Sequence, residues 1–309
     1  MLAVLQVTER CNYTCSFCYV APTRPSGRIR ASGYEDLLDE LSRLGVTSVA
    51  ISGGEPLLVE NLCDVVEALR ARAFAVGLLS NGSRPQSDVL TKVDMAQISI
   101  DGPPQVHDAV RGRRGAFARA VATVRRLQGV GVPVGIQVTC TEETGSYLQE
   151  TLRLVMGLAV QQVRVVVVDK TPGGREEQEW FRPLYEDLLD VSYGSPMQTD
   201  VTCNLVEERF ARAVIGARLE TSPLPLYVSL NSRSVAIGFP ELSLWQIGDE
   251  RLEDRVLSAQ RRVRDSFRAM ASPTRPGSGV VSLDTVLSNE IKRLSRSSDF
   301  CSRHQEGRR

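Results

Sequence analysis

Several features that mark large classes of protein are scarce or missing in this 309-residue chain. Acidic and basic residues number 37 each, so the formal net charge is zero, which argues against a nucleic-acid-binding surface. No window approaches the roughly 20 apolar residues that a membrane-spanning helix needs. Residues 1–6 contain no basic leader, so no secretory signal peptide is expected. We therefore expect a cytoplasmic protein that binds neither nucleic acid nor membrane.

Histidine is also scarce, since the chain has only His107 and His304. The seven cysteines are an odd number, which fits poorly with a disulfide framework. A reducing compartment, moreover, suits thiolate ligands better than disulfides. Cys63, on the same predicted helix face as Leu62, and Cys140 are interpreted as packing residues.

The chain does contain a regular alternation of short apolar strands and amphipathic helices up to about residue 190. The expected strands are Leu2–Thr8, Thr47–Ser52, Ala75–Ser80, Met95–Ile100, Pro133–Thr139 and Val163–Asp169. The expected helices are Tyr34–Leu44, Leu62–Arg72, Pro85–Lys92, Ala116–Gln128, Ser146–Leu158 and Glu176–Val191. This order implies right-handed βαβ units and a parallel sheet. The predicted fold is α/β, a partial (β/α)6 TIM-like barrel with its site at the C-terminal ends of the strands.

Polar and aliphatic residues alternate along the predicted strands, so the two faces of the sheet should differ. Ser99 and Asp101 share one face of the fourth strand, whereas Ile98 and Ile100 take the other. We expect the polar face to line the barrel mouth and the aliphatic face to pack under the helices. The same parity places Cys140 on the helix-facing side.

The pattern changes after residue 190, which divides the chain into three expected parts. Residues 1–190 form the barrel, 191–270 a small α+β C-terminal cap, and 271–309 a weakly ordered tail. The cap contains predicted strands at Leu226–Leu230 and Ser234–Ile237 and a helix at Glu253–Arg268. Ser, Arg, Gly and Pro dominate the tail, where we expect one helix at Asp284–Leu294.

Three cysteines, Cys11, Cys15 and Cys18, crowd into one short loop behind the first predicted strand. Three thiolates on one loop can hold a cube of iron and sulfide, and four cysteines would saturate a four-iron cluster. With three, one iron has no protein ligand and can bind a substrate or cofactor. The alternative is three quarters of a zinc site, but a tetrahedral structural site needs a fourth ligand. No nearby cysteine supplies that ligand.

The cysteine loop resembles the cluster-binding loop of the radical S-adenosylmethionine (radical SAM) enzymes. The resemblance includes the aromatic residue Phe17 before the third cysteine and Tyr19 after it. A second match, Ser52-Gly53-Gly54-Glu55-Pro56, follows the second strand and is similar to the motif that binds the methionyl amino group of S-adenosylmethionine. Consecutive glycines let backbone approach a ligand closely, and Glu55 adds an acceptor for an ammonium group.

Further matches extend the resemblance to the peptide-maturase branch of this superfamily, over roughly residues 1–175. That resemblance makes Ser99 and Asp101 candidates to approach the ribose or carboxylate of S-adenosylmethionine. It also makes Arg111 a candidate partner of the carboxylate, where a guanidinium fork suits two oxygens. Ser80 and Asn81 end the third strand where that branch also contacts the cofactor. The alternative for Arg111 is a solvated basic turn with its neighbours, and His107 is expected to support a loop.

The order of motifs in the C-terminal region is similar to that of a SPASM or twitch extension. In those extensions, clustered cysteines bind auxiliary iron–sulfur clusters. No cysteine lies between Asn204 and Phe300, and Cys203 and Cys301 are isolated. The expectation is therefore one [4Fe-4S] cluster per chain. Cys203 lies in the expected cap, where a thiol can donate a hydrogen atom to a substrate radical. The structural interpretation of Cys203 is favoured over that catalytic one.

The resemblance implies a radical SAM enzyme that cleaves S-adenosylmethionine reductively to a 5′-deoxyadenosyl radical and modifies a C–H bond. The expected substrate is a ribosomally made peptide, with cross-linking or epimerisation as the outcome. A flavodoxin or ferredoxin would donate the electron. The barrel begins at the first residue, so a peptide substrate would need a separate peptide-recognition protein.

Two alternatives to this function stay open at this point. The first is a radical SAM enzyme that acts on a small molecule, such as an amino sugar in natural-product biosynthesis. The second belongs to another class, a non-catalytic pseudo-enzyme that binds S-adenosylmethionine or a partner. The intact cysteine triad argues against the second alternative, because a binding module has no need of an open iron.

Overall fold

The computed structural model describes residues 1–18 and 34–168 continuously. It also describes the shorter pieces 183–186, 200–203, 205–207, 224, 226–229, 234–237, 243–246, 252–269, 280–282 and 291. Tyr19, Cys301 and most of the expected helices Glu176–Val191 and Asp284–Leu294 lie outside these residues.

Six parallel strands form the centre of a ten-stranded sheet. In chain order they are β1 (Leu2–Gln6), β2 (Ser48–Ser52), β3 (Ala75–Ser80), β4 (Met95–Ser99), β5 (Val134–Cys140) and β6 (Gln162–Val167). They pair in this same order, each parallel to the next, as successive βαβ units require. The predicted partial-barrel class is confirmed, and each strand begins and ends close to its predicted bounds.

Strands from beyond residue 190 extend the same sheet at both ends. β7 (Asp200–Cys203) pairs in parallel with β6, and β9 (Leu226–Ser229) pairs in parallel with β1. β10 (Ser234–Ile237) and β11 (Ser243–Gln246) continue antiparallel from β9. These described pieces therefore extend the barrel sheet. The expected division into three parts stays a prediction.

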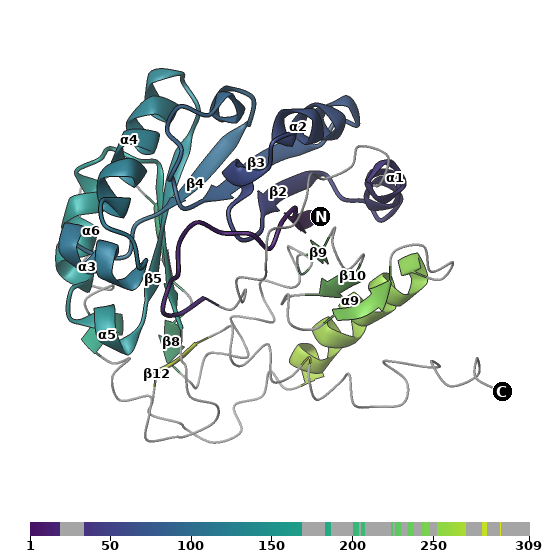
Figure 1. Cartoon of the computed structure of the whole chain (residues 1–309). Coiled ribbons are helices and arrows are strands. Elements are labelled where there is room, and N and C mark those ends of the chain that lie inside the picture. Colours follow the sequence, from purple (N-terminus) through teal and green to yellow (C-terminus); the bar gives the residue numbers. More distant parts are fainter. Residues whose placement is uncertain are drawn as a thin grey trace.

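A second, two-stranded sheet pairs β8 (Leu205–Glu207) with β12 (Val280–Ser282). The sequence analysis predicted neither strand. In the view of Figure 1 this small sheet is drawn below the label of β5.

Helices cover the outer side of the curved sheet (Figure 1). They are α1 (Glu35–Arg43), α2 (Leu62–Ala71), α3 (Pro104–Val110), α4 (Ala116–Gly129), α5 (Glu142–Gly145), α6 (Leu148–Met156) and α9 (Leu252–Ala269). Two short 3₁₀ turns, η2 (Pro56–Leu58) and η3 (Asp88–Thr91), follow β2 and β3. The predicted helix Pro85–Lys92 is wrong, since only η3 forms there. Ser87 and Asp88 compete for backbone hydrogen bonds and so disfavour a longer helix.

The core lies between the sheet and its helices. Val49, Ile51 and Ile98 are fully buried on the helix-facing side, where each such side chain contributes about 1.5–3 kcal/mol. Cys140 is buried in the same cluster, as its parity predicted. On the other face, Gln97 and Ser99 are only half-buried. The alternation therefore sorts apolar residues under the helices and polar residues toward the barrel interior.

Among the described residues, no helix is both long and apolar enough to span a membrane.

Candidate active site at the barrel mouth

The cysteine loop follows β1 and lies across the C-terminal ends of the parallel strands. Cys11 and Cys15 are half-buried, Cys18 is exposed, and none of the three forms a disulfide in the described part of the chain. The amides of Thr14 and Ser16 donate hydrogen bonds to the carbonyls of Arg111 (3.2 Å) and Val110 (3.0 Å) at the end of α3. The loop is thereby held against an element almost 100 residues later in the chain.

The glycine pair after β2 holds the other side of the loop. The Gly54 amide donates to the Thr8 carbonyl at 2.7 Å, and the Glu55 amide donates to the Arg10 carbonyl at 2.8 Å. A Cβ on Gly54 would lie 2.3 Å from the Arg10 carbonyl oxygen, and one on Gly53 would lie 2.4 Å from that of Thr8. The glycines thus let two protein segments come together. The sequence analysis had attributed them to the approach of a ligand.

Gly112 has a similar role that the sequence analysis missed. Its φ is +61°, and a Cβ there would lie 2.2 Å from Thr14 Oγ1. A glycine immediately after a helix is the sequence signal that could have indicated this conformation.

Glu55 is fully buried, and its carboxylate is surrounded by protein donors. Oε1 accepts hydrogen bonds from the Leu57 amide (3.0 Å) and the Ser80 hydroxyl (2.8 Å), and Oε2 accepts from the Asn81 amide (2.8 Å). Burial raises the pKa of Glu55 despite these hydrogen bonds. The carboxylate thus joins the buried Pro56 turn to the end of β3. The expected role of Glu55 as an acceptor for an ammonium group stays a prediction, since Oε1 accepts two of these hydrogen bonds and Oε2 only one.

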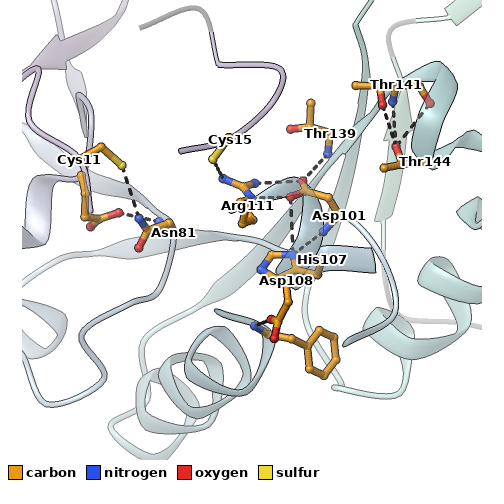
Figure 2. A network of polar contacts seen from close by, with 12 residues as sticks. Cys11, Cys15, Asn81, Asp101, His107, Asp108, Arg111, Thr139, Thr141 and Thr144 are labelled. Atoms are coloured by element: carbon orange, nitrogen blue, oxygen red, sulfur yellow. Dashed lines mark hydrogen bonds and ion pairs between the residues drawn. The ribbon is translucent and has the colours of Figure 1, made fainter. Parts of the chain in front are cut away.

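Asn81 connects the end of β3 to the first cysteine (Figure 2). Its Nδ2 donates to Asn12 Oδ1 at 3.0 Å and to Cys11 Sγ at 3.8 Å. The Tyr13 amide also donates to Cys11 Sγ, at 3.5 Å. Two neutral N–H groups therefore point at the Cys11 sulfur, as is common around thiolates that ligate iron–sulfur clusters.

Arg111 connects α3 to the second cysteine (Figure 2). Nε and Nη2 donate to the two carboxylate oxygens of Asp101, at 2.5 and 3.0 Å, and Nη1 donates to Cys15 Sγ at 3.7 Å. The guanidinium carbon lies 5.2 Å from the centre of the Phe17 ring. Burial alone would lower the pKa of Arg111, but the Asp101 carboxylate raises it above its ordinary value.

These contacts bear on both interpretations of Arg111 from the sequence. Arg111 is 7% exposed and Asp101 is 1% exposed, so this is a buried ion pair rather than a solvated basic turn. Asp101 engages Nε and Nη2 of the guanidinium, and a contact between Arg111 and a cofactor carboxylate stays a prediction. Asp101 accepts a further hydrogen bond from the Thr139 amide at 2.9 Å, a partner that the sequence analysis missed.

His107 supports this region from behind. It is completely buried, and its Nδ1 accepts a hydrogen bond from the Asp101 amide at 3.0 Å. Burial lowers the pKa of His107 to about 4, so the ring is neutral at physiological pH. The next residue, Asp108, accepts hydrogen bonds from the amides of Gly115 (2.5 Å) and Phe117 (2.9 Å) at the start of α4. His107 is thus a packing and positioning residue, as expected.

Two other candidates occupy different strands. Ser99 ends β4 on the barrel-facing side, half-buried and in register with Gln137 of β5. Cys203 ends β7 in register with Val165, which packs on the helix-facing side. The hydrogen-donor role of Cys203 stays a prediction.

The sulfur ligands fit an iron–sulfur cluster. Burial raises the pKa of the Cys11 and Cys15 thiols, and metal binding supplies the positive charge that stabilises the thiolates. In the described part of the chain, no three Cys, His, Asp or Glu side chains lie close enough for one metal ion. A four-iron cluster is larger, and N–H donors already point at two of the sulfurs. His107 is buried behind Asp101 and is not presented to the loop.

Comparison with known proteins agrees with this geometry. The Radical SAM superfamily matches residues 5–155. Pre-heme d1 synthase of Dinoroseobacter shibae is 34% identical over 160 residues, which are 50% of this chain and 40% of that protein. The sporulation killing factor maturation protein SkfB of Bacillus subtilis is 27% identical over 154 residues, 48% of this chain and 38% of that protein. The chain thus covers less than half of each of these curated relatives.

The solved structure of native anSMEcpe with bound AdoMet and Cp18Cys peptide has a TM-score of 0.63 at 13% identity. The match covers 95% of this chain and 96% of that one, and at this identity it shows the shared fold alone. Members of this superfamily use a [4Fe-4S] cluster and S-adenosylmethionine. Residues 5–155, just under half of this chain, are thus similar to the radical SAM superfamily.

Proposed function

We propose that this chain is a radical SAM enzyme with one [4Fe-4S] cluster on Cys11, Cys15 and Cys18. The observation that carries the proposal is the presence of three cysteine thiols on one loop, two of which accept hydrogen bonds from N–H groups of distant elements. When bound, the cluster and S-adenosylmethionine would supply a 5′-deoxyadenosyl radical that takes a hydrogen atom from a C–H bond.

The chain's own residues hold and orient these groups. Asn81 and Arg111 fix the Cys11 and Cys15 sulfurs. Candidate contacts of S-adenosylmethionine are the turn 53–56, the end of β3 at Ser80 and Asn81, and Ser99. At this turn the Glu55 carboxylate, whose Oε2 accepts only one of the three hydrogen bonds, is the candidate acceptor for the ammonium group.

The proposed substrate is a ribosomally made peptide, cross-linked or epimerised. The similarity to SkfB, named as a sporulation killing factor maturation protein, supports this choice. Pre-heme d1 synthase supports the second candidate, a small molecule. We further propose a cytoplasmic location, a flavodoxin or ferredoxin as electron donor, and a separate protein that recognises the peptide.

The test of the enzyme is anaerobic reconstitution with iron and sulfide, followed by dithionite and S-adenosylmethionine. We expect about four irons per chain, an electron paramagnetic resonance signal that changes when S-adenosylmethionine is added, and formation of 5′-deoxyadenosine. Cys15→Ala should abolish all three. Cys63→Ala, which removes a thiol on α2 outside the site, is the matched control and should retain them.

Each contrary outcome identifies a different alternative. Stoichiometric zinc without iron would show that the cysteine loop is a zinc site and would contradict the proposed enzyme. Binding of S-adenosylmethionine without its cleavage would indicate a pseudo-enzyme. About eight irons would contradict the single cluster.

The test of the substrate begins with the genes beside this one. A short open reading frame there should encode a peptide whose mass changes when it is incubated with the reconstituted enzyme. A loss of two hydrogens would indicate a cross-link, whereas deuterium uptake from solvent without other change would indicate epimerisation. Sugar-modifying neighbours and an unmodified peptide would favour the small molecule.

A further inference from the structure

We propose that Arg111 is a positioning residue for the cluster, which raises its reduction potential through a hydrogen bond to the Cys15 sulfur. The inference rests on the proposed function, because it needs a cluster on that thiolate. It assigns Nη1 of the guanidinium to the metal centre.

The contacts of Arg111 fix the position of its guanidinium group. The bidentate pair with Asp101 occupies Nε and Nη2, and Nη1 is directed at Cys15 Sγ at 3.7 Å (Figure 2). Asp101 is itself fixed by the Thr139 amide. The Arg111 carbonyl accepts the Thr14 amide, so the backbone of the same residue holds the loop. Side chain and backbone together set the distance between α3 and the second cysteine.

The arrangement of charges predicts the direction in which Arg111 shifts the reduction potential of the cluster. The Asp101 carboxylate lies on the Nε and Nη2 side of the guanidinium, whereas Nη1 faces the sulfur, so the positive end of the pair is nearer to Cys15. The pair is buried, which weakens screening by water and salt. Reduction adds negative charge to a cluster, and hydrogen bonds to its sulfurs and the surrounding net charge help to set the potential. Arg111 should therefore stabilise the reduced state.

The two ends of the loop are not equivalent in this respect. Cys11 receives hydrogen bonds from the neutral groups of Asn81 and Tyr13. Of the N–H donors identified at the Cys11 and Cys15 sulfurs in the described structure, only Arg111 carries a charge. The neighbouring His107 ring is neutral and adds no second cation. The shift in the reduction potential is therefore expected to come from Arg111.

The test measures the midpoint potential of the reconstituted protein by a redox titration monitored by electron paramagnetic resonance, without S-adenosylmethionine. At a fixed ambient potential, Arg111→Met should lower the ratio of reduced to oxidised cluster about tenfold, equivalent to about 59 mV for one electron. Asp101→Asn, which leaves the cation without its counter-charge, should raise the ratio. Arg113→Met removes an exposed arginine two residues away and should leave the ratio unchanged.

Opposite shifts in the two site variants would support the inference, since a purely structural role does not predict opposite signs. Unchanged potentials in both, with the wild-type cluster intact, would overturn it while leaving the proposed function standing. If Arg111→Met fails to hold a cluster, the reduction potentials of Asp101→Asn and Arg111→Lys test the inference instead. In Arg111→Lys the ratio of reduced to oxidised cluster should lie between those of the wild type and Arg111→Met, because lysine keeps the charge but not the planar fork. If the ratio does not rise in Asp101→Asn, the inference is overturned. A wild-type chain that binds no cluster overturns both proposals.

Discussion

Two regions of the barrel are almost closed to solvent but differ in what fills them. The helix-facing side of the sheet contains aliphatic residues such as Ile51 and Ile98. The mouth buries Glu55, Asp101 and Arg111 just as deeply. An apolar side chain needs only to be buried and well packed, whereas a buried polar group must also find its partner. The mouth should therefore depend on individual contacts and the core on volume.

The largest expected effect is at Glu55, where one carboxylate satisfies three donors. Glu55→Ala would leave the amides of Leu57 and Asn81 and the Ser80 hydroxyl without it, at a cost of about 5 kcal/mol in the free energy of unfolding. Glu55→Gln keeps one oxygen acceptor and the side-chain size, so it should cost clearly less. Urea denaturation of both variants measures the difference. Equal losses would show that volume, and not hydrogen bonding, decides stability at the mouth.

A neighbouring pair on β4 compares the two faces directly. Ile98→Ala removes a fully buried side chain and should destabilise the protein by about 4 kcal/mol, combining lost transfer energy and a cavity. Gln97→Ala, one residue earlier on the barrel-facing side, is half-buried and should cost less than about 0.5 kcal/mol. The same denaturation measurement applies. Similar costs at both positions would contradict the division of the sheet into a core face and an interior face.

A smaller effect concerns the pH dependence that His107 adds to the mouth. Its pKa falls from 6.5 to about 4 on folding, so between these values the unfolded chain binds the proton and the folded chain does not. Stability therefore decreases as the pH falls through this window, by up to about 3 kcal/mol near pH 4. His107→Asn, which keeps a polar acceptor but does not titrate, should show a correspondingly weaker dependence. Parallel denaturation series at pH 4 and 7 provide the measurement, and identical slopes would exclude a buried neutral histidine.

Element positions were predictable wherever the pattern was local. Strands β1 to β6 and helices α1, α2, α4 and α9 follow from hydrophobic periodicity, which each segment carries by itself. The wrong helix at Pro85–Lys92 and the missed strands β7, β8, β11 and β12 lack such periodicity over enough residues. Their structure is instead decided by the elements beside them, as the pairing of β7 with β6 shows.

The candidate site was predictable as a set of residues but not as a set of contacts. The spacing of the cysteines and the Gly53-Gly54-Glu55 turn indicated which segments meet. The sequence analysis assigned Glu55 and Arg111 to the cofactor, and the structure adds partners for both within the protein. Residue type alone does not distinguish a charged group that waits for a ligand from one that already has a partner.

The sequence by itself determined which residues are apolar under the helices, where the strands run, and that three thiols share a loop. Only the tertiary structure decided that Arg111 reaches Cys15 across 96 positions and that Asn81 reaches Cys11 across 70. The physical reason is that periodicity is read within one segment, while these contacts depend on the register of several parallel strands. That register brings the carboxyl ends of the strands, with their polar side chains, to one edge of the sheet.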